Sequence, residues 1–563
     1  MTASLPPFVV FFAGALLVSL APARLQKGLL LLVPVIGGLQ LLTIPETYKI
    51  VFPLMGHELV PFRIDRLSLL FGYIFTLAAL IGNVFSLHLH DRLQHVAGLV
   101  YAGSALGAVF AGDLISLFVF WELTAISSVF LIWAGRTPAS TAAGLRYLVI
   151  QLVSGLLLLA GVLVRYRETG SLAFTYIGLD GLSGWLIFLA FGIKCAFPLL
   201  HNWLTDAYPE STPTGTVFLS AFTTKMAVYA LTRGFPGTEI LIYIGAVMTC
   251  FPIFYAVIEN DLRRVLGYSL INQLGFMVCG IGIGTTLAIN GAVSHAFSHI
   301  IYKALLFMSM GAVLQMTGKI KGTDLGGLYK TMPVTTCLCI VGALSISAFP
   351  LFSGFVSKSM VLAAALQENH DWVWLALLLA SAGVFHHAGI KIPFFTFFAR
   401  DSGIRVSEPP LNMLLAMGLA AGLCIFIGIW PGVLYSLLPY PVEYSPFTFT
   451  HVIAQLQLLF FSALAFTWLK LTGLYPPEMR SVNIDAEWIY RRLGPQLSSR
   501  ARHAVRPLAR HVRLHFLRPV KAVIDILMLY HGPHGILART WATGSMVLWI
   551  VILLGIHLIA YYY

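Results

Sequence analysis

The sequence predicts an all-α, polytopic membrane protein, and two observations lead to this fold class. Of its 563 residues, 58% are hydrophobic and 10% are charged, with a mean hydropathy of +0.85. Ordinary soluble proteins are about 45–50% apolar and about 25% charged. The apolar residues also gather in runs that reach the ~20 residues needed to cross a bilayer. A soluble globular fold is therefore excluded, and a window moved along the chain predicts about 14 to 16 spans.

Short loops that hold many of the Arg and Lys residues separate these spans. The basic loops 24–27, 263–264 and 319–330 indicate the cytoplasmic side and place the N-terminus outside. Segment 354–366 is short and is expected to be half of a span. In chain order the predicted spans are 7–21, 28–44, 67–87, 96–111, 114–133, 147–164, 182–200, 214–232, 239–257, 266–284, 288–316, 333–350, 354–366, 372–398, 411–431, 451–471 and 541–561.

Composition divides the chain into five parts. We expect N-terminal transmembrane helices over 1–112, a core with internal repeats over 113–400, further core helices over 401–474, a basic region over 475–540 and an extra span over 541–563. The basic region is typical of an amphipathic helix on an anionic membrane surface. A solvated basic linker is an equal alternative, and Pro507 and Pro519 argue against one long straight helix.

Two lysines, Lys194 and Lys225, lie inside successive apolar segments. A lysine at mid-bilayer depth costs roughly 2.5–3.5 kcal/mol on insertion scales, so such a residue usually has a function. Pro198 follows Lys194 and is expected to break its helix. Broken helices that carry ionisable groups form the ion sites of many transporters. We therefore predict that these lysines carry protons through the membrane.

A weak internal repeat accompanies them. Gly192-Ile193-Lys194 precedes Pro198, and Gly389-Ile390-Lys391 precedes Pro393. Interrupted segments in corresponding halves point to an inverted-repeat transporter site, although two such short matches can also arise by chance. The pattern predicts Lys391 as the partner of Lys194 in the repeat and as the exit group of a relay.

Glu122 lies within an apolar span, directly after Trp121. A buried carboxylate is expensive unless it is paired. We predict a Glu122–Lys194 pair that opens and closes, which would couple a conformational change to proton release. A static buried pair is the alternative.

His295, His299 and Lys303 follow at spacings of four residues and share one helical face. Histidine both gives and takes protons near neutral pH, so with Lys225 these groups form a predicted relay. The alternatives are a zinc site, for which no third ligand is evident, and histidines that only bridge helices. Lys358, His386 and His387 stay open between functional and packing roles. Four acidic residues near span ends are expected to be ordinary solvated loop charges, with proton or cation entries as the alternative: Asp113, Asp206, Glu210 and Asp261.

No signature of covalent or redox chemistry is present. The sequence holds no phosphate-binding glycine loop, no nucleophile elbow and no cysteine spacing typical of metal or iron–sulfur ligation. We therefore expect no cofactor, no metal and no electron transfer on this chain. The net charge of +12 does not indicate a nucleic-acid partner, because much of it lies in loops and in the C-terminal region.

Several ordered stretches resemble a known family: FWELTAISSVFLI, IKCAFPLLHNWLTDAYPE, FLSAFTTKMAVYALTR, SHAFSHIIYKALLFMSMGAVL and FPLFSGFVSKSM. They are similar to the proton-translocating module shared by antiporter-like membrane subunits of respiratory complex I, related hydrogenases and Mrp-type sodium/proton antiporters. The residues of these stretches are most similar to those of the D-type subunits of the Mrp antiporters. The basic extension goes beyond the family's common core.

The resemblance implies about 14 core helices, with two inverted five-helix repeats that each contain a broken helix. It implies that Glu122 and Lys194 form the pair, that Lys391 ends the relay, and that the central line lies between them: Lys225, His295, His299 and Lys303. It further implies membrane-subunit partners, protons and Na⁺ as transported ions, and a multi-pass location in the inner (plasma) membrane. A pumping subunit of a complex I-like enzyme or hydrogenase, and an inactive anchoring subunit, are the alternatives.

Overall fold

The computed structural model of the chain describes residues 5–54, 56–475, 479, 483, 485–532, 535 and 543–562. It contains two compact units, Met1–Asp485 and Ala486–Tyr563. Among the described residues, 12 helices are long and apolar enough to cross a membrane, accompanied by the shorter apolar helices Pro7–Leu20, Gly181–Lys194 and Pro333–Ile346. The all-α, polytopic class predicted from the sequence is confirmed.

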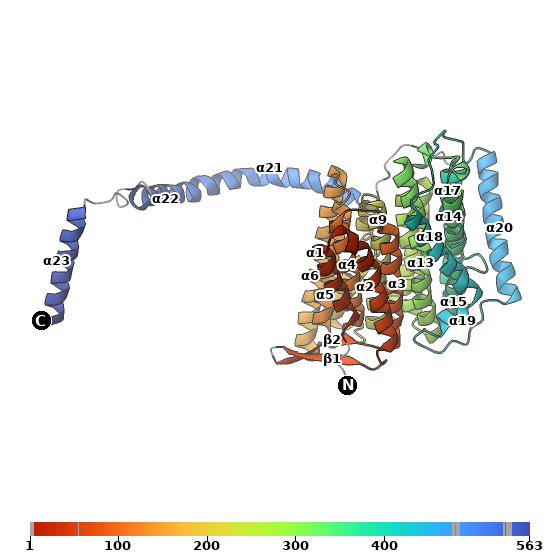
Figure 1. The fold of residues 1–563 in the computed structure, drawn as a ribbon, viewed down its shortest axis with the longest axis horizontal. Coiled ribbons are helices and arrows are strands. Elements are labelled where there is room, and N and C mark those ends of the chain that lie inside the picture. The colour runs from red at the N-terminus through yellow and green to blue at the C-terminus, as the bar shows by residue number, and fades with distance from the viewer. Residues whose placement is uncertain are drawn as a thin grey trace. The chain divides into compact units, whose positions relative to one another are not determined.

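The N-terminal part of the first unit is a group of four helices with a small hairpin (Figure 1). Its helices are α1 (Pro7–Leu20), α2 (Ala23–Thr43), α3 (Arg66–Ser86) and α4 (Arg92–Phe110). The hairpin joins β1 (Lys49–Leu54) to β2 (His57–Arg63) in antiparallel register, with Lys49 opposite Arg63. The sequence does not predict this hairpin, because a proline in each strand opposes strand pairing.

The next helices form the centre of the first unit. In chain order they are α5 (Leu114–Trp133), α6 (Pro138–Thr169), α7 (Gly181–Lys194), α8 (Asn202–Ala207), α9 (Pro213–Ala221), α10 (Thr223–Gly234), α11 (Ile240–Ile258), α12 (Leu262–Ile283) and α13 (Thr286–Thr317). Many begin at a side-chain cap: Asp113 accepts a hydrogen bond from the Ser116 N–H, and Thr137 forms a capping box with Ser140.

The remaining helices of the first unit are α14 (Pro333–Ile346), α15 (Ser353–Gln367), α16 (Asp371–Val384), α17 (Lys391–Pro393), α18 (Leu411–Ile429), α19 (Pro431–Tyr435) and α20 (Phe449–Leu471). Two π-helical segments, η3 (Phe385–Ile390) and η4 (Phe394–Phe398), flank α17, and two 3₁₀ turns, η1 (Gly322–Asp324) and η2 (Leu328–Lys330), precede α14.

Two helix breaks have the same backbone geometry. After α7, Ala196 and Leu199 adopt positive φ angles of 61° and 68°. After α14, Ala348 and Leu351 adopt φ angles of 56° and 72°. Both breaks carry the tetrapeptide Ala-Phe-Pro-Leu, at 196–199 and 348–351. Left-handed backbone at non-glycine residues is costly, so its occurrence at matching places marks these two segments as equivalent.

The helix break expected at Lys391 and Pro393 is wrong, while the pairing of Lys391 with Lys194 in the repeat stays a prediction. Residues Asp371–Phe398 form one continuous helical stretch, and around Lys391 the helix widens into the π-helical η3 and η4 instead of breaking. A π-helix shifts hydrogen bonds by one residue and keeps the chain helical, so Pro393 is accommodated. The second break lies about 40 residues earlier, at 348–351. A further break, unpredicted, separates α9 from α10 at Phe222.

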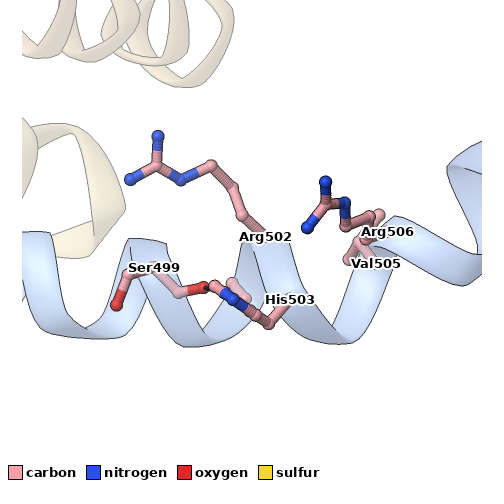
Figure 2. A pocket seen from close by; sticks show the side chains of 6 residues that line it. Ser499, Arg502, His503, Val505 and Arg506 are labelled. Carbon is pink, nitrogen blue, oxygen red and sulfur yellow. Dashed lines mark hydrogen bonds between the residues drawn. The ribbon is translucent and has the colours of Figure 1, made fainter.

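The second unit contains η5 (Ile489–Leu493), α21 (Gly494–Val512), η6 (Arg513–Leu517), α22 (Arg518–His531) and α23 (Thr543–Tyr562). The helix α21 runs through Pro507, and the π-helical η6 precedes Pro519. Arg502 and Arg506 lie one turn apart on α21 (Figure 2). The predicted last span corresponds to α23, while its expected first residues, 541 and 542, lie outside the described residues.

The left-handed residues at the breaks lead to a first prediction. The side chains of Leu199 and Leu351 are 73% and 53% exposed, so their replacement leaves no packed cavity. β-Branched isoleucine is disfavoured at positive φ, and strain of this kind costs of order 1–3 kcal/mol. We expect Leu199→Ile and Leu351→Ile to lower the thermal unfolding midpoint in detergent, and the corresponding glycine variants not to lower it. Equal midpoints for the isoleucine and glycine variants would contradict this account of the breaks.

Candidate functional site

The seven residues predicted as the relay all lie in the first unit, on helices close to the two breaks. Six of them are 0% exposed: Lys194, Lys225, His295, His299, Lys303 and Lys391. Glu122 is partly buried. Buried ionisable groups on this scale are rare in membrane helices and are associated with ion pathways.

Lys194 is the last residue of α7, directly before the first break. Its ammonium donates hydrogen bonds to the Trp121 carbonyl at 2.5 Å and to the Thr124 hydroxyl at 3.0 Å. It also lies 4.6 Å from the centre of the Trp121 ring, a cation–π contact. The charge is thus held by backbone, hydroxyl and aromatic groups of α5.

Glu122 and Lys194 are close neighbours without a direct ion pair in this arrangement. The lysine binds the carbonyl of the residue before Glu122, while the Glu122 Oε1 atom is buried and has no hydrogen-bond partner among the described residues. The carboxylate faces Gly155 of α6, and the missing Cβ of this glycine makes the space that Glu122 occupies. The opening and closing of a Glu122–Lys194 pair stays a prediction.

Lys225 lies just after the break between α9 and α10. Its ammonium donates a 2.6 Å hydrogen bond to the Ser220 carbonyl, which belongs to the last turn of α9. The break frees this carbonyl from its helical partner, so it can accept the bond. A second polar contact, between the Tyr101 hydroxyl and Thr223 at 2.5 Å, lies beside the same break.

The α13 residues form a row, as their spacing predicts. The rings of His295 and His299 are 6.2 Å apart. His295 Nδ1 lies 3.1 Å from the Ser357 hydroxyl, and its Nε2 lies 3.4 Å from the Tyr302 hydroxyl. Neither ring nitrogen of His299 nor the Lys303 ammonium has a hydrogen-bond partner within the described part of the chain.

The sequence left the role of Lys358 open between function and packing. The structure places this lysine next to the row, because it follows Ser357, whose hydroxyl contacts His295. It lies on α15, one turn after the second break, and is 1% exposed. Its ammonium donates to the Ile346 carbonyl at 3.0 Å and lies 5.0 Å from the Phe276 ring centre. The repeated Ala-Phe-Pro-Leu tetrapeptide was the sequence signal that could have placed it. From α20, the Gln455 amide donates to the Ser347 carbonyl of the same break at 3.2 Å.

Lys391 binds three carbonyls at the end of α11. Its ammonium donates to Ala256, Val257 and Glu259 at 3.3, 2.7 and 2.7 Å. Such a cap satisfies carbonyls that a helix C-terminus leaves unpaired. The role of Lys391 as exit group stays a prediction, and the contacts add a structural role. Nearby, both ring nitrogens of His387 are buried and unpartnered among the described residues.

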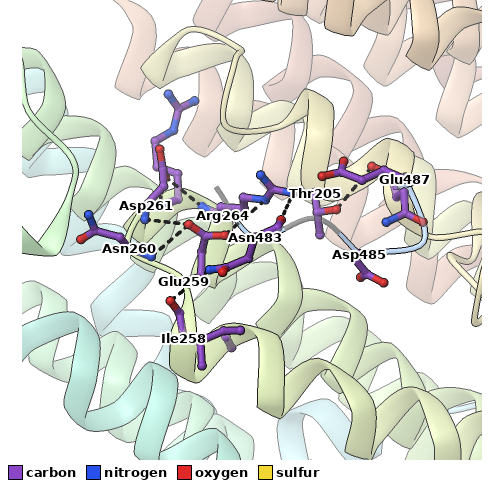
Figure 3. Close-up of polar contacts among 12 residues, drawn as sticks. Thr205, Ile258, Glu259, Asn260, Asp261, Arg264, Asn483, Asp485 and Glu487 are labelled. Carbon is purple, nitrogen blue, oxygen red and sulfur yellow. Dashed lines mark hydrogen bonds and ion pairs between the residues drawn. The ribbon is translucent and has the colours of Figure 1, made fainter. Parts of the chain in front are cut away.

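A polar cluster lies between α11 and α12 (Figure 3). Glu259 accepts hydrogen bonds from the Asn260 and Asp261 N–H groups, and Arg264 lies 3.5 Å from its carboxylate. Burial raises the pKa of the Glu259 carboxyl above its usual value, against the lowering effect of Arg264. Asn483, beyond α20, donates to the Ile258 carbonyl at 3.1 Å.

Two of the carboxylates expected to be solvated loop charges are buried. Asp113 is 2% exposed and accepts hydrogen bonds from the Val60 N–H and Ser116. Asp206 is 6% exposed and is held by a bidentate bond from Arg146 at 2.6 and 3.0 Å. The expectation of solvated charges was wrong for these two, because Asp113 joins the start of α5 to β2 and Asp206 joins α8 to α6. Over the described residues, no cluster of three His, Cys, Asp or Glu side chains could hold a metal ion.

Fold and site together define a polytopic membrane subunit whose helix breaks lie beside buried cations. A family model described as NADH:quinone oxidoreductase/Mrp antiporter, TM, matches residues 111–384. The chain is 32% identical to the N subunit of the NADH-quinone oxidoreductase of Desulforudis audaxviator, over 59% of this chain and 70% of that protein. The chain therefore belongs to this family, and the resemblance drawn from its motifs is confirmed.

Two further relatives extend the comparison. The chain is 33% identical to the D-type subunit of the Na⁺/H⁺ antiporter of Alkalihalophilus pseudofirmus, over 52% of this chain and 64% of that protein, so it spans under two thirds of that relative's length. A chain in the structure of the membrane-bound sulfane sulfur reductase, an archaeal respiratory membrane complex, matches with a TM-score of 0.71 at 21% identity. That match covers 98% of this chain and 99% of the other, which shows a shared fold.

The contact between Glu122 and Gly155 leads to a second prediction. A Cβ at position 155 would overlap the Glu122 carboxylate, so Gly155→Ala must displace Glu122. If the Glu122 carboxylate has to occupy the space beside Gly155, cation-dependent proton movement in membrane vesicles will fall by about tenfold or more. This is the scale of a lost charged hydrogen-bond partner. Gly418→Ala is the matched control, because a Cβ there meets nothing within 4 Å. Equal activity of the two variants would show that the position of Glu122 is unimportant.

Proposed function

We propose that the chain is the proton-conducting subunit of a multisubunit Na⁺/proton antiporter. The observation that carries the proposal is the row of buried basic side chains beside the helix breaks: Lys225 and Lys358 donate to backbone carbonyls, and His299 and Lys303 have no hydrogen bond among the described residues. A fixed structural charge would need a counter-ion at this depth. A group that alternates between charged and neutral forms does not, and such a group moves protons.

The proposed path begins at Lys194, continues through Lys225 to His295, His299 and Lys303, and ends at Lys391. Each basic group in a low-dielectric region disfavours a second charge nearby, so a proton arriving at one group displaces the proton of the next. Lys303 and His299 suit this role, because no hydrogen bond among the described residues holds them in one protonation state. We add Lys358 to the path, because it is buried next to His295 through Ser357.

The proposed switch is Lys194. In this arrangement its ammonium binds the Trp121 carbonyl and not Glu122. Rotation toward the Glu122 carboxylate would form an ion pair that favours the protonated lysine, and return to the Trp121 carbonyl would favour proton release. The break after α7 favours this movement, because Lys194 is the last residue of the helix and no further helical turn packs over it.

The remaining parts of the proposal concern the surroundings. The partners are other membrane subunits and the lipid bilayer, the transported ions are protons and Na⁺, and the location is the inner (plasma) membrane. The name of the A. pseudofirmus relative, a Na⁺/H⁺ antiporter subunit, supports the choice of protons and Na⁺ as the transported ions. We propose no redox cofactor and no nucleic-acid partner on this chain.

A second candidate function is the proton-pumping membrane subunit of a complex I-like quinone oxidoreductase or membrane-bound hydrogenase. The observation that favours it is the 32% identity to a NADH-quinone oxidoreductase subunit over 70% of that protein. Both candidates use the same proton path and differ in what drives it. Subunits that co-purify in mild detergent distinguish them: flavin or iron–sulfur subunits indicate the second candidate.

Removal of the switch lysine tests the proposal directly. We expect Lys194→Ala to lower proton-coupled cation transport in vesicles by about 100-fold or more, the scale on which a positioned proton-transfer group acts. The exposed Lys319, in the loop after α13, provides the control variant Lys319→Ala, which should transport normally. Near-normal transport by Lys194→Ala, at equal membrane abundance, would refute the proposed path.

Glu122→Gln tests the charge of the proposed pair. Glutamine fills the same space beside Gly155 and cannot attract the ammonium by charge, so transport should fall by about tenfold or more. The pH at which transport is half-maximal should also move, because Lys194 would lose the partner that favours its protonated form. An unchanged pH profile would count against pairing.

A further inference from the structure

The helix α10 carries a second polar line, which leads away from Lys225. Lys225, Tyr229 and Arg233 follow at spacings of four residues, so they lie along one side of the helix over about 12 Å. Lys225 and Tyr229 are 0% exposed, while the Arg233 side chain is 12% exposed. The line therefore runs from the buried relay to the end of the bundle that carries the β1–β2 hairpin.

Arg233 is fixed at the end of this line by charged and aromatic partners. Its guanidinium donates two hydrogen bonds to the Asp65 carboxylate, at 2.8 and 2.7 Å, and one to the Tyr229 hydroxyl at 2.8 Å. It also lies 5.0 Å from the Tyr229 ring centre and 5.9 Å from that of Phe174. Arg63 of β2 approaches the same carboxylate at 3.8 Å.

Asp65 is held in its charged form. Burial tends to raise its pKa, but Arg233, the Ser68 N–H and Arg63 together keep the pKa of this carboxyl below its usual range. Asp65 is also the N-cap of α3, where it accepts a hydrogen bond from Ser68. Its position is thus fixed by the helix start and its charge by the guanidinium.

A cavity of about 460 Å³ lies directly on this ion pair. Asp65, Arg233 and Thr232 line it together with Tyr176 and Tyr440. The Asp65 side chain is 37% exposed, so the cavity communicates with the surface. Its size admits several water molecules, and Tyr229 and Lys225 follow Arg233 inward along α10.

We infer that protons exchange between Lys225 and the outer aqueous phase through this cavity, and that the Asp65–Arg233 ion pair closes the route. The inference deepens the proposed function and rests on it for the role of Lys225. While the pair is formed, the guanidinium is held against Asp65 and the Tyr229 hydroxyl, where it occupies the route and keeps water from Tyr229. When the pair opens, Arg233 moves into the cavity with its charge intact, and water reaches the Tyr229 hydroxyl and then Lys225.

Water access past the pair can be measured with an introduced thiol. Met226 lies one residue beyond Lys225, is 0% exposed, and can become Cys without altering the pair. In the full chain within its membrane complex, Met226→Cys should react slowly with a membrane-impermeant methanethiosulfonate added from the outer side. Asp65→Asn removes the charge and keeps a good helix cap. It should raise the reaction rate of the thiol at position 226 by about tenfold or more, the scale of a lost charged hydrogen bond.

The controls separate gating from general loosening. Ala227→Cys is equally buried and points about 100° around the helix, so its reaction rate should stay the same when Asp65→Asn is added. Asp91→Asn, at the N-cap of α4, removes an ion pair with Arg136 at the other end of α3 and should leave the reaction at position 226 slow. An unchanged rate at position 226, or an equal rise at position 227, would overturn the inference.

A transport measurement separates this inference from the proposed function. A pH gradient across vesicles that contain the complex should decay faster with Asp65→Asn, and Lys225→Ala should abolish the faster decay. Faster labelling of the thiol at position 226 without faster decay would overturn the proton route. The parent complex could also fail to couple cation movement to proton movement, while Asp65→Asn still speeds the decay of the pH gradient and Lys225→Ala still abolishes that effect. This result would refute the antiport function and support the proton route.

Discussion

Ammonium groups held by backbone carbonyls are the interaction on which the core depends. Lys225 binds a carbonyl at the end of α9, Lys358 one at the end of α14, and Lys391 three at the end of α11. Carbonyls at helix C-termini lack helical donors and carry the negative end of the helix dipole. For Lys225 and Lys358, these carbonyls stabilise a buried ammonium through partial charges, which disappear less abruptly than a full countercharge when the lysine loses its proton.

The helix breaks follow from the same requirement. A carbonyl inside a helix is already bonded to a helical donor, whereas a carbonyl at a helix end can accept a further donor. The break after α14 supplies such an end for Lys358, and the break at Phe222 supplies one for Lys225. Lys194 instead shares the Trp121 carbonyl within the continuous helix α5. Glu122 complements this arrangement: with no hydrogen bond to its buried oxygen among the described residues, it is a poorly satisfied group close to Lys194, able to compete with the carbonyl for the ammonium.

Much of this could be predicted from the sequence, and the failures have physical causes. The polytopic fold, the first break and the burial of Lys194, Lys225 and the α13 row follow from apolar length, proline and helical spacing. The second break was assigned to Pro393, because a proline after a lysine indicates the same motif whether the helix breaks there or widens into a π-helix. Asp206 gave no signal of burial, because its partner Arg146 lies 60 residues away. The hairpin and the Asp65–Arg233 pair could likewise not be predicted from the sequence, because both depend on contacts that no local pattern encodes.

The three hydrogen bonds of Lys391 have a mechanical meaning. They join the last turn of α11 to a helix more than 130 residues further along the chain, and they do so through one side chain at a place where that helix is widened. The join acts as a strut between the two elements. A change of charge at this one nitrogen atom would alter the strength of all three bonds together, and so change how firmly the two helices are held against each other.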